Sequence, residues 1–259
     1  MSSSHSTQKT NSLLSFLTRW TDNQDGSSYA DFETKEPNVY RRVSILPDTD
    51  PLNPRQEYDN ICTMLCWHSR YKLGDNYYLR SPLSKVSSHK WESWPDVYKN
   101  VDAVLGKAKA FLDEDYPFGD YDERLGPGIV APLYLYDHSG LTISTSPFSC
   151  PWDSGQIGWI HCSYEKANRE LLAKPLKHPA RSTRLRQRMQ ACIDAEVATY
   201  DAYLRGDVWG YEIALVEKDE QGDFLVIEEL DSCWGFYGHD VVKEEALSSL
   251  KALVSTQKT

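Results

Sequence analysis

Three apolar runs between residues 129 and 162, separated only by short polar segments, constrain the fold more than any other feature of the sequence. The first run covers residues 129–136, and after the turn Asp-His-Ser-Gly the chain returns through residues 141–145. A loop rich in Ser, Pro and Asp then leads to a third run at 156–162. Strands joined by such short connections pair in antiparallel fashion. This segment therefore predicts an antiparallel sheet.

The rest of the sequence adds further strands and several helices. Strands are predicted at 40–46, 208–217 and 224–230, the last two as a hairpin around DEQGD. Helices are predicted at 96–112, in a short stretch that begins at 163 or 164, at 181–204 before Gly206, and at 241–254. Residues 60–71 fit one face of a helix, although a strand is also compatible with them. The fold is therefore predicted to be α+β, mainly an antiparallel sheet of about five or more strands packed against several helices.

The domain organisation follows from where polar residues collect. Residues 1–35 are rich in Ser, Thr, Asn, Gln and Asp, which predicts a flexible N-terminal segment. No linker divides the remainder into two halves that could each hold a core. Residues 36–259 are therefore predicted to form a single α+β domain.

The cysteines and the start of the chain indicate an intracellular protein. The first ten residues lack the apolar core of a secretory signal, and no run is long enough to span a membrane. The six cysteines are therefore expected to be free thiols in the cytoplasm of a host cell. Their spacing matches no zinc finger, and we expect no bound metal and no cofactor.

The charge of the chain is unevenly distributed. The formal net charge of −10 argues against general binding to a nucleic-acid backbone. Residues 165–188 carry eight Lys and Arg against two acidic residues, whereas residues 194–245 carry fifteen acidic residues against three Lys and Arg. Each charged run can simply form a solvated face of the protein. Alternatively, the electrostatic field of one run can attract a binding partner.

Two polar corners, at 137–139 and 152–156, form the densest chemical segment. If their strands are neighbours in the sheet, the corners lie close together in space. Their candidate binding residues are Asp137, His138, Ser139, Trp152, Asp153, Ser154 and Gln156.

Asp137, His138 and Asp153 are also the candidate catalytic residues. Asp, His and Ser side chains can orient one another for nucleophilic chemistry, and two carboxylates with a histidine can hold a divalent metal. The alternative is purely structural, because Asp and Ser favour turns by bonding to their own backbone.

Two further segments supply candidate binding residues. Trp67, His68 and Arg70 lie together, and an arginine among aromatic rings can bind a phosphate or stack on a base. Asp231 opens the segment DSCWGFYG near the end of the chain. For both segments a packed structural element is the competing interpretation.

These segments together resemble an uncharacterised family of proteins from bacteriophages and mobile elements. The resemblance rests on four motifs: DNICTMLCWHSRYKLGD at 59–75, YDHSG at 136–140, PFSCPWDSGQIG at 147–158 and DSCWGFYG at 231–238. It covers about residues 40–240 and implies an accessory protein that acts inside a host cell. No catalytic residue is implied by it.

Counter-defence is the leading functional hypothesis, of the anti-CRISPR or anti-restriction type. The acidic part of the chain would imitate a phosphate backbone and occupy a host defence or nucleic-acid-processing protein. The alternative is a nucleotide-binding protein or metal-dependent hydrolase that uses Asp137, His138 and Asp153. A virion component is a third possibility, and the chain is a possible homodimer.

Overall fold

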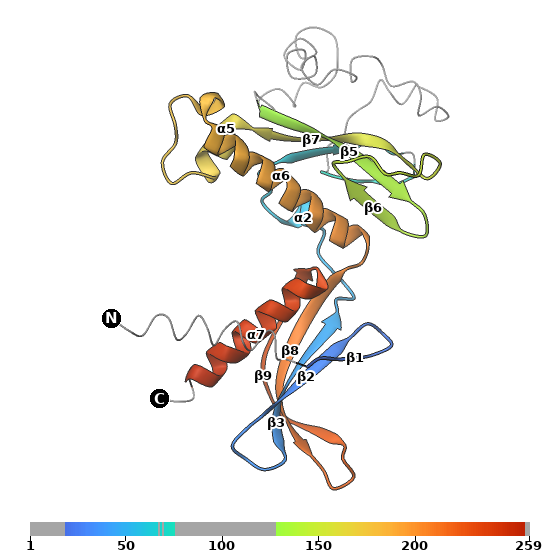
Figure 1. Cartoon of the computed structure of the whole chain (residues 1–259), viewed down its shortest axis with the longest axis vertical. Helices are drawn as coiled ribbons and strands as arrows, with labels where there is room; N and C mark the ends of the chain where they lie inside the picture. Colours follow the sequence, from blue (N-terminus) through green and yellow to red (C-terminus); the bar gives the residue numbers. More distant parts are fainter. Residues whose placement is uncertain (1–18, 67, 69, 76–127, 257–259) are drawn as a thin grey trace. The chain divides into compact units, whose positions relative to one another are not determined.

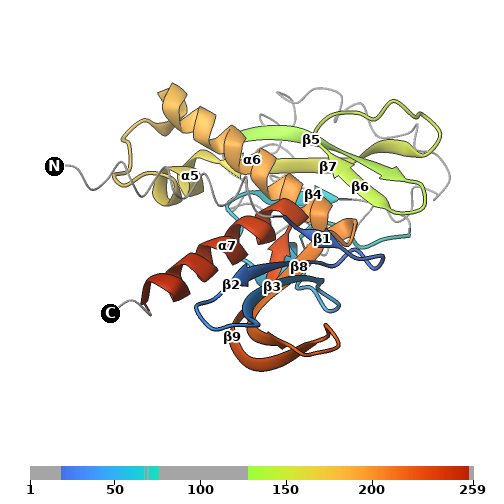
Figure 2. The same ribbon diagram turned by 60° about the horizontal axis from the view of Figure 1, so that its bottom comes forward.

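The computed structural model describes residues 19–66, 68, 70–75 and 128–256. The chain forms two compact units, shown in Figures 1 and 2: unit 1 comprises residues 1–52 and 206–259, and unit 2 comprises residues 53–205. Unit 2 is therefore inserted in sequence between the two segments that build unit 1. Compact units need not be domains that fold separately, so the single domain over residues 36–259 stays a prediction.

Where the structure describes unit 1, it consists of a five-stranded antiparallel sheet and one long helix. The strand order is β1-β2-β3-β8-β9, which makes β9 an edge strand of this sheet. The elements are β1 (Thr21–Asp22), β2 (Ser28–Glu33), β3 (Val39–Pro47), β8 (Val208–Lys218), β9 (Phe224–Tyr237) and α7 (His239–Thr256). The central pair joins β3 to β8 from Val39 opposite Glu217 to Pro47 opposite Trp209. Chain segments on either side of the insertion thus share one sheet.

The core of unit 1 lies between this sheet and α7, which runs alongside the sheet in Figure 1. Alternate residues of a strand point to the same face, and residues four apart on a helix do the same. The buried residues that meet here are Val43, Ile45, Tyr211, Ile213, Val242, Ala246 and Leu250. Because of these two spacings, each strand and the helix turn one apolar face toward the same core.

The described residues of unit 2 form a four-stranded antiparallel sheet of order β4-β7-β5-β6, together with three α-helices. Its strands are β4 (Thr63–Cys66), β5 (Gly128–Asp137), β6 (Leu141–Ser144) and β7 (Ser154–Ser163). Its helices are α2 (Pro54–Glu57), α5 (Tyr164–Glu170) and α6 (Thr183–Leu204), with a 3₁₀ turn, η4 (Pro179–Arg181), before α6. The N-cap hydroxyls of Ser163 and Ser182 accept the backbone N–H groups of Lys166 and Leu185, which sets where α5 and α6 begin.

The long helix α6 lies across the sheet of unit 2 in Figures 1 and 2. Its buried stripe repeats every three to four residues: Leu185, Met189, Ile193, Val197 and Tyr200. This stripe packs on the sheet residues Leu133, Leu135, Ile143, Ile157 and Ile160. Gly206 follows the helix with φ of +69°, as expected for the residue that ends a helix.

The structure confirms the α+β class, with the antiparallel strands divided between two sheets. The helix favoured for residues 60–71 is wrong, because residues 63–66 form strand β4, which pairs with β7. In the predicted flexible segment 1–35, residues 28–33 form β2, whose Ser28 and Ala30 are buried. The predicted helix at 96–112 lies outside the described residues. No helix in the described ranges has the length and apolar character needed to cross a membrane.

Candidate functional site

The two polar corners of the sequence meet at one end of the unit 2 sheet. Tyr136 of β5 is opposite Ser154 of β7, and the Asp137 N–H donates to the Asp153 carbonyl at 2.8 Å. The turn after β5 reverses at Ser139, whose φ of 59° lies in the left-handed region. Strand pairing thus brings the segments together as the sequence predicted. We call these joined residues, 137–139 and 152–154, the polar corner.

One histidine–carboxylate contact lies within the polar corner, and one ion pair joins the corner to Arg70. His138 Nδ1 lies 3.3 Å from Asp153 Oδ2, and their side chains are 62% and 40% exposed. Arg70 forms an ion pair with Asp137. The second predicted segment therefore reaches the same surface as the first, which the sequence alone did not indicate. Because these side chains are exposed to water, each pair contributes little to stability.

His68 holds the backbone that carries Arg70. Its Nδ1 accepts the N–H groups of Arg70 and Tyr71, each at 3.2 Å, and its ring stacks on Tyr71 at 4.9 Å between centroids. Burial, followed by the nearby charge of Arg70, lowers the pKa of His68. A neutral imidazole keeps Nδ1 free of a proton, as its two acceptor contacts require. His68 therefore positions Arg70. The third predicted residue of this segment, Trp67, lies outside the described residues.

The remaining residues around the corner divide into structural and exposed groups. The Ser154 hydroxyl donates to the Cys150 carbonyl, and Gln156 Nε2 donates to the Gly158 carbonyl at 3.3 Å. Both side chains are thus occupied by local backbone groups. Trp152 is different, since it is 91% exposed. Tryptophan is enriched among the residues that contribute most to binding at protein interfaces, whereas a single exposed apolar side chain is also common on ordinary surfaces.

Asp231 has a structural role in unit 1. Its Oδ2 accepts the Tyr211 hydroxyl at 3.0 Å and also the Ser249 hydroxyl. These contacts join β9 to β8 and α7. Asp231 therefore belongs to the packing of unit 1 and not to the polar corner of unit 2.

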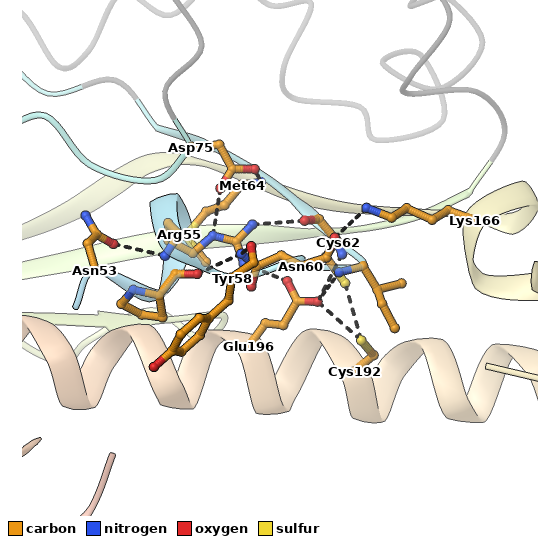
Figure 3. Close-up of polar contacts among 12 residues, drawn as sticks. Asn53, Arg55, Tyr58, Asn60, Cys62, Met64, Asp75, Lys166, Cys192 and Glu196 are labelled. Atoms are coloured by element: carbon orange, nitrogen blue, oxygen red, sulfur yellow. Dashed lines mark hydrogen bonds and ion pairs between the residues drawn. The ribbon is translucent and has the colours of Figure 1, made fainter. Parts of the chain in front are cut away.

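A buried ionic network in unit 2 was not predicted from the sequence. Arg55, whose side chain is 0% exposed, follows Asn53 and Pro54 at the start of α2. Its Nε lies 2.7 Å from Asp75 Oδ1, and one terminal nitrogen lies 2.6 Å from Glu196 Oε2. The other terminal nitrogen donates to the Cys62 carbonyl at 2.9 Å. Figure 3 shows the guanidinium held between the two carboxylates.

Both carboxylates of this network also hold the backbone at the start of β4. Glu196 Oε1 accepts the N–H groups of Ile61 and Cys62 at 2.8 and 3.0 Å. Asp75 Oδ2 accepts the N–H of Met64 at 3.0 Å. Each charged group thus has hydrogen-bond partners, which is the condition under which buried ions are tolerated.

One sequence signal for this network was present. Glu196 lies within the apolar stripe of the helix at 181–204, between Ile193 and Val197. A carboxylate in such a stripe requires a buried cation or several N–H donors. The partner is 141 residues away in the sequence, so its identity cannot be deduced from helix periodicity.

Thiols lie beside the same network. Cys62 Sγ is 3.9 Å from Cys192 Sγ, and Cys192 Sγ is 3.4 Å from Glu196 Oε1. Among the described residues, Cys62, Cys192 and Glu196 form the one group of three ligand-type side chains with all ligand atoms within 4.8 Å of one another. The predicted set of Asp137, His138 and Asp153 does not meet this condition.

Compared with protein-family models, with curated protein sequences and with solved structures, the chain matches none of them. The family resemblance of its motifs therefore stays a prediction.

Proposed function

We propose that the chain is an accessory protein of a bacteriophage or mobile element that acts in counter-defence. It would bind a host defence or nucleic-acid-processing protein in the cytoplasm of the host cell. One observation carries this proposal: a carboxylate-rich hairpin, residues 217–229, at the edge of the unit 1 sheet. We call this segment the acidic hairpin. Its sequence contains one cation, Lys218.

The carboxylates of the acidic hairpin are available to a partner. Five of them are exposed: Glu217, Glu220, Asp223, Glu228 and Glu229. No ion pair joins any of the five to another residue in the described part of the chain. Unpaired exposed carboxylates keep their full field, which a basic groove on another protein can sense.

The charge spacing supports imitation of a single nucleic-acid strand. Residues 223–229 extend over about 20 Å at about 3.3 Å per residue. Residues 223–229 contain three of the five exposed carboxylates. Glu217 lies alongside them on the paired arm, opposite Leu225, and Glu220 lies in the turn that joins the arms. The two arms together therefore carry about one charge per 4 Å. Duplex DNA carries one charge per about 1.7 Å of its axis, but each strand carries one per about 3.4 Å. The hairpin thus approaches the charge density of one strand.

The hairpin also offers apolar contacts that a nucleic acid lacks. Leu225, Val226 and Ile227 are 62%, 65% and 53% exposed, and β9 is an edge strand. Consecutive exposed apolar residues on an edge strand favour association with another protein. We therefore expect a partner whose groove is basic and also has an apolar wall.

Neutralising the acidic hairpin tests the proposal. The variant carries Glu217→Gln, Glu220→Gln, Asp223→Asn, Glu228→Gln and Glu229→Gln. In pull-downs from a host lysate at two salt concentrations, we expect the native chain to recover a nucleic-acid-processing protein at low salt. The variant should recover about tenfold less of it and show a weaker dependence on salt, because fewer charges are screened.

A matched control neutralises five exposed carboxylates away from the hairpin: Asp50→Asn, Glu57→Gln, Asp59→Asn, Glu165→Gln and Asp194→Asn. It changes the net charge by the same amount and should retain binding. Recovery of no nucleic-acid-processing protein by the native chain at low salt would refute the proposal. Equal losses in the variant and the control would show that net charge, and not the hairpin, matters.

A second candidate function is nucleotide binding or hydrolysis at the polar corner. The observation that favours it is the exposed His138–Asp153 pair at 3.3 Å, because a carboxylate can orient a histidine that acts as a general base. Asp137 is already paired with Arg70. This pairing favours hydrolysis by the histidine and Asp153 over a mechanism in which Asp137 binds a metal ion.

The substitution Asp153→Ala tests this second candidate. If the corner is catalytic, nucleotide turnover should fall at least about hundredfold while the melting temperature stays close to that of the native chain. Turnover and melting temperature are compared with those of Asp59→Ala, which removes an exposed carboxylate elsewhere. Unchanged turnover in Asp153→Ala would exclude a catalytic role for the pair.

A further inference from the structure

We propose that Cys62, Cys192 and Glu196 bind one thiophilic divalent cation, such as Zn²⁺, in the interior of unit 2. The site is separate from the polar corner and from the acidic hairpin, and it does not depend on the proposed function. Its ligands come from two places in the chain. Cys62 precedes β4, whereas Cys192 and Glu196 lie one helical turn apart on α6. Figure 3 shows the three side chains converging between these elements.

The distances between the three ligand atoms match those around zinc. With Zn–S bonds of about 2.3 Å and tetrahedral angles, two sulfur ligands lie about 3.8 Å apart. The observed separation between Cys62 Sγ and Cys192 Sγ is 3.9 Å. A sulfur and a carboxylate oxygen around zinc lie about 3.5 Å apart. The observed separation between Cys192 Sγ and Glu196 Oε1 is 3.4 Å. The third separation, between Cys62 Sγ and Glu196 Oε1, is within 4.8 Å.

The surrounding hydrogen bonds hold these ligands in place. The N–H groups of Ile61 and Cys62 fix Glu196 Oε1, and Arg55 fixes Oε2. The hydrogen bonds to Glu196 are of the kind that orient a metal ligand. Cys162, which is buried on β7, adds a third thiol close to Cys62. A water molecule would complete the four-coordinate shell.

The charges of the network favour exchange of protons for a metal ion. Arg55 carries one positive charge and faces the two carboxylates of Asp75 and Glu196, which leaves one negative charge among these three. Lys166 donates to the carbonyl of Asn60 and to neither carboxylate.

Binding exchanges one ion for two protons. The ion, with two positive charges, would replace the thiol protons of Cys62 and Cys192. The buried charge is unchanged by this exchange, so burial itself does not oppose it. The ion would then join the entry of β4 to α6, in addition to the Glu196 contacts and the Cys62–Cys192 contact that already connect these elements.

The experiment measures binding of Zn²⁺ and Co²⁺ by the full chain, purified with a reductant and stripped with a chelator. We expect one equivalent of Zn²⁺ per chain by native mass spectrometry and a higher melting temperature with Zn²⁺ than with chelator. Co²⁺ should produce the absorption band of thiolate-to-metal charge transfer. The variant Cys62→Ser/Cys192→Ser should lose at least tenfold in affinity, together with this band and the shift in melting temperature.

The control is Cys150→Ser/Cys233→Ser, which removes two thiols outside the site and should bind as the native chain does. Melting in chelator shows whether each variant is folded, and the cobalt band of the native chain gives evidence independent of any variant. Three results would overturn the proposal. These are no Zn²⁺ binding by the native chain, equal binding by Cys62→Ser/Cys192→Ser, or a Cys62–Cys192 disulfide in the protein isolated from the cytoplasm.

Discussion

Replacing Glu196 by alanine is expected to reduce the free energy of unfolding by about 3 to 5 kcal/mol. Arg55, with a side chain that is 0% exposed, would lose one of its two carboxylate partners. The N–H groups of Ile61 and Cys62 would lose their acceptor as well. A buried donor without an acceptor costs about 1 to 3 kcal/mol, so the several losses add to a large effect.

The measurement is chemical denaturation of the full chain, followed by far-ultraviolet circular dichroism with chelator present. Chelator separates this effect from any contribution of a bound metal. Asp194→Ala is the matched control, since it removes an exposed carboxylate from the same helix and should change stability by less than about 0.5 kcal/mol. If Glu196→Ala is no less stable than Asp194→Ala, the network does not stabilise unit 2.

Replacing Gly158 by alanine is expected to destabilise unit 2 by about 3 kcal/mol or more. A Cβ atom at this position would lie 1.8 Å from the carbonyl oxygen of Leu65 and 3.0 Å from Cα of Cys66. Both atoms belong to the backbone of β4, which pairs with β7 at Cys66 opposite Gly158. A backbone atom cannot move aside as a flexible side chain can, so the two strands would have to separate.

The test compares Gly158→Ala with Gly140→Ala by thermal denaturation and by hydrogen exchange of the β4 amides. A Cβ at Gly140 would meet no atom within 4 Å, so this control should melt close to the native temperature. Gly158→Ala should melt several degrees lower, and its β4 amides should exchange faster than those of the control. Equal exchange in the two variants would mean that β4 tolerates the added methyl group.

The elements with a clear period were predictable. The 22-residue helix α6 was expected at 181–204, and its apolar stripe matches the residues that are buried. The strands at 129–136, 141–145 and 156–162 follow from short turns, and β5, β6 and β7 lie there. Local sequence predicts such helices and strands because one face of each must be apolar over several successive turns or residue pairs, and this leaves a regular pattern in the sequence.

The segment at 60–71 shows where local pattern is insufficient. Seven of its twelve residues are apolar, but their spacing is compatible with both a helix and a strand. The edge of β7 decides between them by offering hydrogen bonds to residues 63–66. Gly158 permits the close approach, and nothing within 60–71 records the presence of that glycine.

The polar corner was predictable in part. Asp137 and Asp153 lie close together because their strands are neighbours, which the sequence predicted. Arg70, which pairs with Asp137, comes from a segment 67 residues away, and the sequence did not indicate this contact. The pairing of Arg70 reduces the number of free carboxylates at the corner. It thereby shifts the balance of the two functional proposals toward binding by the acidic hairpin.

The sequence by itself determined the α+β class, the positions of the main strands and helices, and the concentration of acidic residues in the last third of the chain. Each of these depends on residues that are near one another in sequence. The tertiary structure alone decided the division into two sheets, the strand at 63–66 and the burial of Arg55 between Asp75 and Glu196. These features depend on hydrogen bonds and charges from residues far apart in the chain. Local periodicity carries no information about which distant group will satisfy a buried one.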